Sequence, residues 1–238
     1  SPPPGPSGGF ESLDAMKSLP SWECLSVRNS KAVLRRSMLG LRRKMSKEEV
    51  QSKSGEIARN LTGTIEYGES RLIAFYASFD NEVDTWKLIE ESLREGKRVA
   101  IPFLRSPSEG LLLSEVRDLT RELTEGSFGI LEPKAEFIRP IPLEQVELLI
   151  VPGVAVDRRG YRLGFGKGYY DRLLKAMLPQ AVSVGLAYSF QVLDRVPTEK
   201  GDEPVARLIT EAGAMDCVSE RFFSRAQGPL GRSTVDHD

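Results

Sequence analysis

Histidine is nearly missing from this sequence. Among the 238 residues only His237 is a histidine, and it stands next to the C-terminal residue. Catalytic groups that use histidine as the general base, and zinc sites built on histidine ligands, are therefore excluded from the body of the chain. Any catalysis must depend on carboxylates, lysine, arginine, tyrosine, backbone amides or a metal bound by oxygen ligands.

Cysteine is scarce as well. Cys24 and Cys217 lie near opposite ends and form no Cys-x-x-Cys pair. A single disulfide is one possibility, but two free thiols in a reducing compartment are the better interpretation, so we predict a cytoplasmic protein. The first nine residues are rich in proline, glycine and serine and do not resemble a secretory signal, although they leave organellar import open.

Neither a long apolar run nor an excess of one charge is present. No segment approaches the roughly 20 apolar residues that span a bilayer. The 33 basic and 34 acidic residues nearly cancel, which predicts no nucleic-acid or membrane partner. With 40% hydrophobic residues the chain can form an ordinary globular core. We expect a monomer that acts on a small molecule.

Composition divides the chain into three parts. Residues 1–27 begin with "SPPPGPSGG" and predict a disordered or loosely attached extension, and residues 225–238 predict a flexible tail. Residues 28–224 have the length of one domain.

Apolar patterns within this domain alternate between strands and helices. The Ser46 and Glu49 spacing is that of a capping box and predicts a helix from about 47 to 62. Further helices are expected at 30–45, 84–96 and 168–178, and strands at 71–77, 97–102, 110–116, 147–152, 181–188 and 205–210. Such alternation predicts an α/β fold, a sandwich with a mainly parallel sheet.

The most informative stretch is "GYRLGFGKGYYDR" at 160–172, between an expected strand and helix. Gly164, Gly166 and Gly168 can adopt positive φ, so that successive amides point at one anion beside a helix N-terminus. With Arg162 and Lys167 added, the stretch fits a polyphosphate. By glycines alone a simple turn is equally acceptable, because the spacing is neither that of a Walker loop nor that of a dinucleotide fingerprint.

Aspartate in the following helix adds a second signal. Asp171 lies in the first turn, where a carboxylate can be an ordinary helix-start residue. Beside a phosphate site it can instead hold Mg²⁺.

These residues resemble a known family. "VPGVAVDRRGYRLGFGKGYYDR" is similar to the C-terminal motif of 5-formyltetrahydrofolate cyclo-ligases, also called methenyltetrahydrofolate synthetases. Four further blocks match in the family's order: "KAVLR", "NEVDTWKLIEESLREGKRVAIP", "GSFGILEP" and "VPTEKGDEPVARLITE". The resemblance spans about 31–211 and implies a single-domain Rossmann-like three-layer sandwich. It also implies ATP- and Mg²⁺-dependent closure of 5-formyltetrahydrofolate to 5,10-methenyltetrahydrofolate, with release of ADP and phosphate.

The resemblance also implies a role for individual residues. Lys167 and Tyr169 would be catalytic, and Asp171 and Asp202 would hold Mg²⁺. The nucleotide would be bound by Lys31, Arg35, Arg162, Leu163, Gly164, Phe165, Gly166, Lys167, Gly168, Tyr169 and Tyr170. The reduced folate would be bound by Ala77, Glu82, Phe165, Gly166, Lys167, Gly168 and Tyr169.

Some observations leave alternatives open. Gly201 and Ala206 replace residues that relatives often carry in "HDxxxD", while Asp202 is retained. Without the resemblance, Lys31 and Arg35 would be a solvated basic helix face, the tyrosines packing residues, Glu82 and Asp202 loop acids, and Asp84 a helix cap. A non-catalytic paralogue that binds a nucleotide or folate, or a sugar-phosphate or acyl-CoA enzyme of similar fold, remains an alternative hypothesis.

Overall fold

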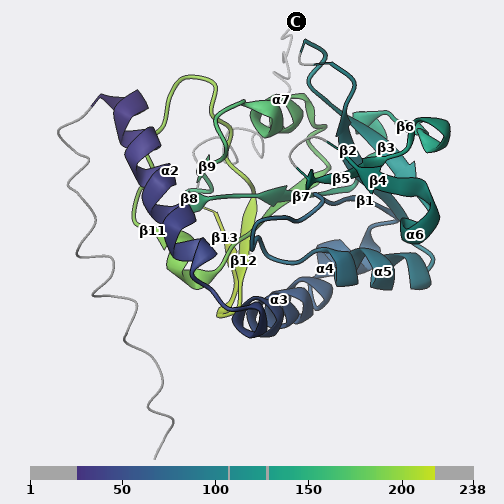
Figure 1. The fold of residues 1–238 in the computed structure, drawn as a ribbon, viewed down its shortest axis with the longest axis horizontal. Helices are drawn as coiled ribbons and strands as arrows, with labels where there is room; N and C mark the ends of the chain where they lie inside the picture. Colours follow the sequence, from purple (N-terminus) through teal and green to yellow (C-terminus); the bar gives the residue numbers. More distant parts are fainter. Residues whose placement is uncertain (1–25, 107, 127–128, 218–238) are drawn as a thin grey trace, which may run out of the picture.

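Eight strands form the central sheet of the computed structural model, which describes residues 26–106, 108–126 and 129–217 (Figure 1). Their order is β13-β12-β10-β7-β1-β2-β3-β6. The five strands from β12 to β2 run parallel, while β13 at one edge and β3 and β6 at the other pair antiparallel. The expected α/β fold with a mainly parallel sheet is confirmed.

The elements have the following bounds. The strands of the main sheet are β1 (Leu72–Ala74), β2 (Arg98–Leu104), β3 (Leu111–Val116), β6 (Pro140–Ile141), β7 (Leu148–Pro152), β10 (Val182–Leu186), β12 (Arg207–Thr210) and β13 (Gly213–Asp216). Two smaller sheets contain β8 (Ala155–Asp157), β9 (Arg162–Leu163) and β11 (Val192–Leu193), and β4 (Leu123–Glu125) and β5 (Leu131–Pro133). The α-helices are α2 (Val27–Arg43), α3 (Lys47–Thr62), α4 (Ile65–Glu69), α5 (Trp86–Arg94), α6 (Leu119–Glu122) and α7 (Tyr169–Ala176). Short 3₁₀ turns are η3 (Ala135–Phe137), η4 (Leu143–Gln145) and η5 (Ser189–Gln191).

Helices cover both faces of the sheet, because side chains alternate along each buried strand. Ile73 and Phe75 pack into one cluster with residues of α3, α4 and α5, whereas Leu72 and Ala74 pack into another with residues of α7. Figure 1 shows α3, α4 and α5 along one side of the sheet and α7 on the other. The result is the expected three-layer arrangement.

Helix α2 lies apart from these layers, against the small sheet β11-β8-β9 (Figure 1). Leu34 and Met38 of the helix are buried with Ala155 and Leu163 of β8 and β9. This packing places α2 beside the segments that follow β7.

Helix boundaries agree closely with the sequence patterns. Helix α3 starts at Lys47 after a capping box in which Ser46 and Glu49 exchange hydrogen bonds. For α5 the cap position is Thr85, and Asp84 stands one residue earlier, where its carboxylate accepts from the Trp86 amide at 2.9 Å.

Short elements were missed by the sequence patterns. The segment from 117 to 146, for which no element is predicted, contains α6, β4, β5 and β6, and neither α4, β13 nor the sheet β11-β8-β9 is predicted. Most of these strands have only two to four residues, which is too short for an apolar period to be recognised.

Both ends of the chain reach beyond the described residues. The expected extension, apart from residues 26 and 27, and the expected tail lie outside them, as does Cys24. Cys217 is free and buried, and burial raises the pKa of its thiol to about 12, which makes it unreactive. Over the described ranges, no helix has both the length and the apolar composition needed to cross a membrane.

Candidate active site

The glycine stretch forms a strand-to-helix loop, the glycine loop (residues 164–168), as the sequence predicts. Strand β9 ends at Leu163, and α7 begins at Tyr169 with Gly168 as its N-cap at φ +64°. Gly166 has φ +94°. Gly164 does not use positive φ, and a Cβ there would meet no atom within 4 Å. Only Gly166 and Gly168 therefore need glycine for their backbone conformation. At Gly164 the missing side chain leaves space beside the backbone.

Arg35 joins α2 to this loop. Its Nε donates to the carbonyl oxygen of Gly164 at 2.7 Å. A Cβ on Gly166 would stand 3.3 Å from an Arg35 nitrogen, so the close approach of the guanidinium favours glycine there.

Lys31, one turn earlier on α2, reaches a different loop. Its Nζ lies 2.6 Å from Asp202 and 3.2 Å from Glu199. Asp202 also accepts from the backbone amide of Glu199 at 2.8 Å. The structure thus brings together Lys31 and Asp202, which are separated in the sequence by most of the domain.

Asp171 connects the glycine loop to the same segment. Its Oδ1 lies 2.9 Å from Arg162 and accepts from the backbone amide of Glu203 at 3.1 Å. Asp171 therefore contacts the residue next to Asp202, and both carboxylates border one loop.

The donor set near these acids suits a hard cation. Mg²⁺ is commonly held by one or two carboxylates together with substrate phosphates and water. Within the described ranges, no cluster of three or more His, Cys, Asp or Glu side chains could hold a metal by itself. Asp171 and Asp202 fit an ion that a polyphosphate brings with it, and do not fit a permanently bound structural metal.

The remaining loop side chains differ in environment. Phe165 is 46% exposed, and Lys167 is exposed with no ion pair to another described residue. The Tyr169 ring lies 4.9 Å from the Arg172 guanidinium. Burial, and to a smaller extent the carboxylate of Glu82, raise the pKa of Tyr170, so its hydroxyl stays protonated.

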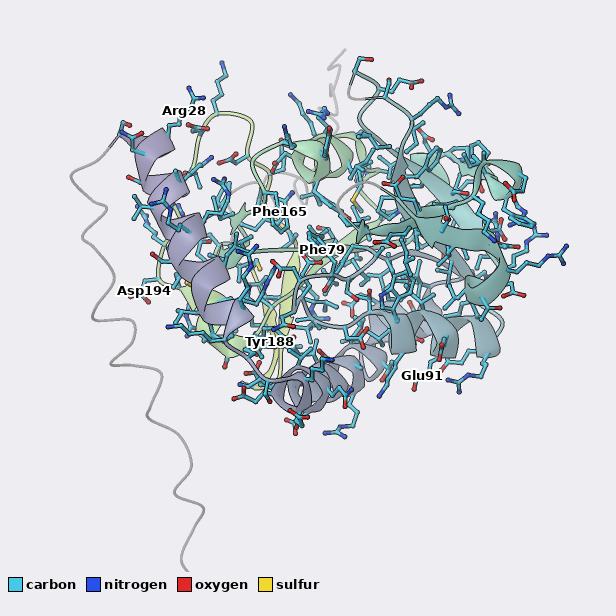
Figure 2. The ribbon with its side chains drawn as sticks, viewed as in Figure 1. Arg28, Phe79, Glu91, Phe165, Tyr188 and Asp194 are labelled. Atoms are coloured by element: carbon cyan, nitrogen blue, oxygen red, sulfur yellow. The ribbon has the colours of Figure 1, made fainter. Side chains whose placement is uncertain are left out.

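A second part of the site is the turn of residues 78–82, which follows β1 and the buried Ala77. Glu82 is buried, and its Oε2 accepts from the Phe79 amide at 3.2 Å. Burial raises the pKa of Glu82 to about 7, against the opposing effect of Arg42. The Phe79 and Phe165 rings lie 5.3 Å apart, so this turn meets the glycine loop (Figure 2).

Arg42 and Phe79 contact candidate site residues and were not predicted from the sequence. Arg42 is 1% exposed and lies 3.7 Å from Glu82. A signal for it exists, because the buried face of α2 repeats every four residues at Ser30, Leu34, Met38 and Arg42. A charge at a core-facing position is unusual and points to a specific role.

A shallow depression of about 450 Å³ lies elsewhere, lined by residues that begin β1 and β2 or precede β7, among them Arg71, Arg98 and Glu147. It is at the amino ends of the parallel strands. Ligands of open α/β sheets bind at the carboxyl ends, where the glycine loop and the 78–82 turn lie.

Comparison with known proteins gives this arrangement a family. The family model for 5-formyltetrahydrofolate cyclo-ligases matches residues 27–211. The chain belongs to the 5-formyltetrahydrofolate cyclo-ligase family. The cyclo-ligase of Escherichia coli K12 is 35% identical over 170 residues, which cover 71% of this chain and 93% of that protein.

Structural comparison agrees with the family. The solution structure of 5,10-methenyltetrahydrofolate synthetase from Aquifex aeolicus has a TM-score of 0.71 and 36% identity, and covers 87% of this chain and 99% of that one. A mitochondrial cyclo-ligase of Arabidopsis thaliana is 31% identical over 157 residues, which are 57% of this chain and 56% of that protein. As a cyclo-ligase, the chain is an enzyme of folate one-carbon metabolism, in a family that uses ATP.

Proposed function

We propose that this cyclo-ligase closes 5-formyltetrahydrofolate to 5,10-methenyltetrahydrofolate by transferring the γ-phosphoryl group of ATP to the formyl oxygen. The observation that carries the proposal is the meeting of basic side chains with two carboxylates at the carboxyl ends of the strands. Lys31 pairs with Asp202 at 2.6 Å, and Arg162 pairs with Asp171 at 2.9 Å. Both pairs border the glycine loop. Such a mixture suits a polyphosphate with its metal.

The nucleotide would lie along the glycine loop and the adjoining face of α2. Exposed Lys167 and the amides around Gly164 and Gly166 are available to phosphate oxygens, and Arg35 is already held against the loop. We assign ATP to Lys31, Arg35, Arg162, Leu163, Gly164, Phe165, Gly166, Lys167, Gly168, Tyr169 and Tyr170.

The folate would lie between this loop and the 78–82 turn. Glu82 would accept two N–H bonds from the aminopyrimidinone edge of the ring, as carboxylates do. The exposed Phe165, in contact with Phe79, offers an apolar surface for the bicyclic ring. We assign the folate to Ala77, Glu82, Phe165, Gly166, Lys167, Gly168 and Tyr169.

The reaction needs no nucleophile from the protein. The formyl oxygen attacks the γ-phosphorus while the bond to the ADP oxygen breaks, which leaves an imidate-like phosphate ester. The neighbouring folate nitrogen then attacks the formyl carbon, loses its proton, and inorganic phosphate departs. Holding the two substrates in line can supply about 7–11 kcal/mol of the barrier.

The protein's own groups act through charge and position. Lys167 would neutralise the transferring phosphoryl group, and Tyr169 would donate to the formyl oxygen or stack on the ring. Asp171 and Asp202 would hold Mg²⁺, which when bound spreads the charge of the phosphate oxygens.

Two departures from relatives are compatible with activity. Gly201 has φ +106°, and nothing lies within 4 Å of a Cβ placed there. Ala206 is held through its backbone, since its amide donates to Ser183. Asp202, between them in the sequence, keeps its contact with Lys31.

The direct test is ring closure by the purified full chain. Protein with 5-formyltetrahydrofolate, ATP and Mg²⁺ should produce the absorbance of the methenyl cation, and omission of ATP or addition of EDTA should abolish it. If the complete mixture gives no ATP-dependent product, the proposed activity is wrong and the non-catalytic paralogue becomes the better hypothesis.

The domain limits and cellular setting remain proposals. We place the catalytic unit at 28–224, acting as a cytoplasmic monomer without nucleic-acid or membrane partners. A chain that lacks residues 1–27 should retain most of the activity, and a large loss would show that this segment belongs to the enzyme.

A further inference from the structure

We infer that Arg42 binds the folate directly, by donating from its guanidinium to the ring carbonyl oxygen that adjoins the N–H groups accepted by Glu82. The inference rests on the proposed function and extends it, because it names a residue that would make the site specific for the 4-oxo form of the ring.

The first observation is that Arg42 is buried without hydrogen-bond partners. Its side chain is 1% exposed. None of its three guanidinium nitrogens has a hydrogen-bond partner among the described residues. Leaving a buried charged donor unpaired is unfavourable, whereas an acceptor supplied by a ligand would satisfy it.

The second observation is the direction in which the guanidinium lies. It is 3.7 Å from the Glu82 carboxylate and 3.7 Å from Asp80, outside hydrogen-bond distance of both. Its central carbon lies 5.9 Å from the ring centre of Phe165. Arg42 therefore lies between Asp80 and Glu82 of the turn and Phe165 of the glycine loop. The ring of Phe165 in turn meets that of Phe79 (Figure 2).

The third observation is chemical complementarity. The edge of an aminopyrimidinone ring presents an amino group, a ring N–H and a carbonyl oxygen in sequence. A carboxylate can accept from the first two, and an adjacent guanidinium can donate to the third. Glu82 and Arg42 offer these two groups side by side.

A purely structural role is the competing explanation. In that case Arg42 would balance the charge of Glu82 and join α2 to the turn. Its removal would then lower the affinity for every folate alike. Direct contact with the carbonyl oxygen predicts selectivity instead. In a 4-amino analogue a donor replaces the carbonyl oxygen and the adjacent ring nitrogen has no hydrogen, so the change in preference between wild type and an Arg42 variant separates the two explanations.

The experiment measures, without ATP, the affinity of the full chain for 5-formyltetrahydrofolate and for its 4-amino analogue. Wild-type protein should prefer the 4-oxo compound by roughly 10- to 100-fold, the effect expected for one charge-assisted hydrogen bond. Arg42→Met should reduce this preference roughly tenfold or more. The part of the preference that is due to Glu82, which loses the ring N–H in the analogue, should remain. Taking the ratio of the two affinities cancels any effect of the substitution on folding, because both compounds share it.

Arg43→Met is the matched control. Arg43 is the next residue of α2, its side chain is 63% exposed, and it pairs with Asp80 at 3.0 Å. It should keep the wild-type preference. If Arg42→Met keeps that preference too, Arg42 does not contact the carbonyl and the inference is overturned.

Two further outcomes are decisive. If Arg42→Met does not fold, Arg42→Leu replaces it in the same comparison, and equal affinity of wild-type protein for the two compounds overturns the inference in either case. If wild-type protein shows the preference and Arg42→Met loses it while ring closure is absent, the proposed function fails and the assignment of Arg42 stands.

Discussion

The glycine loop and the 78–82 turn contact each other through Phe165 and Phe79, but the charged side chains beside them differ in burial and in pairing distance. In the loop region Lys31 pairs with Asp202 and Arg162 pairs with Asp171, and the two carboxylates are 21% and 23% exposed. At the turn, Glu82 is 5% exposed and lies 3.7 Å from Arg42 of α2, which is 1% exposed.

This difference indicates what each region can bind. A partly exposed ion pair such as Lys31–Asp202 contributes little net stability, so phosphate and metal can replace these partners at small cost. Arg162, the partner of Asp171, is 5% exposed, so that pair can separate only where phosphate and metal take over both charges. A buried, poorly paired carboxylate and guanidinium cannot be compensated by solvent. They fit a ligand whose donors and acceptors are fixed on a rigid ring.

The strongest test of the loop's role is Asp171→Asn. If Asp171 holds Mg²⁺, kcat should fall roughly 100- to 1000-fold, as when a charge-stabilising group is removed. The fold should remain, because asparagine can still accept from the Glu203 amide, but some stability is lost with the ion pair to the buried Arg162, so kcat is measured well below the melting midpoint. The control is Asp194→Asn, at an exposed acid away from the loop (Figure 2), which should leave kcat unchanged. A near-normal kcat for Asp171→Asn would remove this residue from the metal site.

The strongest test of the turn is the pH dependence of stability in Glu82→Gln. The folded-state pKa of Glu82 is raised from 4.5 to about 7 by burial, with Arg42 and the Phe79 amide opposing and Asp80 adding to the shift. The folded state therefore holds a proton that the unfolded chain loses, and wild-type stability should fall as pH rises from about 4.5 to about 7.

Removing this carboxyl should make the curve flatter. Above pH 7 the difference amounts to at most about 3 kcal/mol in favour of Glu82→Gln, measured by urea unfolding across the pH range. Glu90→Gln, at an exposed glutamate, should follow the wild-type curve. Parallel curves for wild type and Glu82→Gln would show that Glu82 is not ionising in a buried site.

A pair of glycine substitutions sharpens the comparison inside the motif. Gly160 has φ +86°, and a Cβ there would collide with the carbonyl oxygen of Val205, so Gly160→Ala should lose roughly 1–3 kcal/mol of stability. Gly164 has open space around it. Gly164→Ala should keep the thermal midpoint and raise the KM for ATP roughly tenfold, about 1.4 kcal/mol. An unchanged KM would argue against nucleotide at that backbone.

The smallest effect is expected at Ser46, which belongs to neither region. Loss of its hydrogen bond to the Glu49 amide in Ser46→Ala should reduce the free energy of unfolding by about 1 kcal/mol. Turnover at a temperature well below the melting midpoint should equal that of wild type. A changed kcat would mean that the start of α3 influences Arg42 and the turn.

Much of the fold was predictable because its signals are local. The capping box at Ser46 and the apolar strands at 72–74 and 148–152 depend on residues close in sequence. The motif at 160–172 likewise predicted, from adjacent residues alone, a loop between a strand and a helix that can bind an anion. The short strands β4, β5, β6 and β13 were not predictable, because each is stabilised by a partner strand and carries no pattern of its own.

The sequence by itself determined the α/β class, the family and the chemical types available to the site, since a chain with one histidine must act through charge and position. Only the tertiary structure decided which of those groups meet. Lys31 approaches Asp202, and Arg42 lies buried beside Glu82, because α2 packs across the ends of strands that are distant in sequence. Burial and pairing arise from such distant contacts, so a charge that looks like any other on a basic helix can become a buried one whose nitrogens make no hydrogen bond within the described residues.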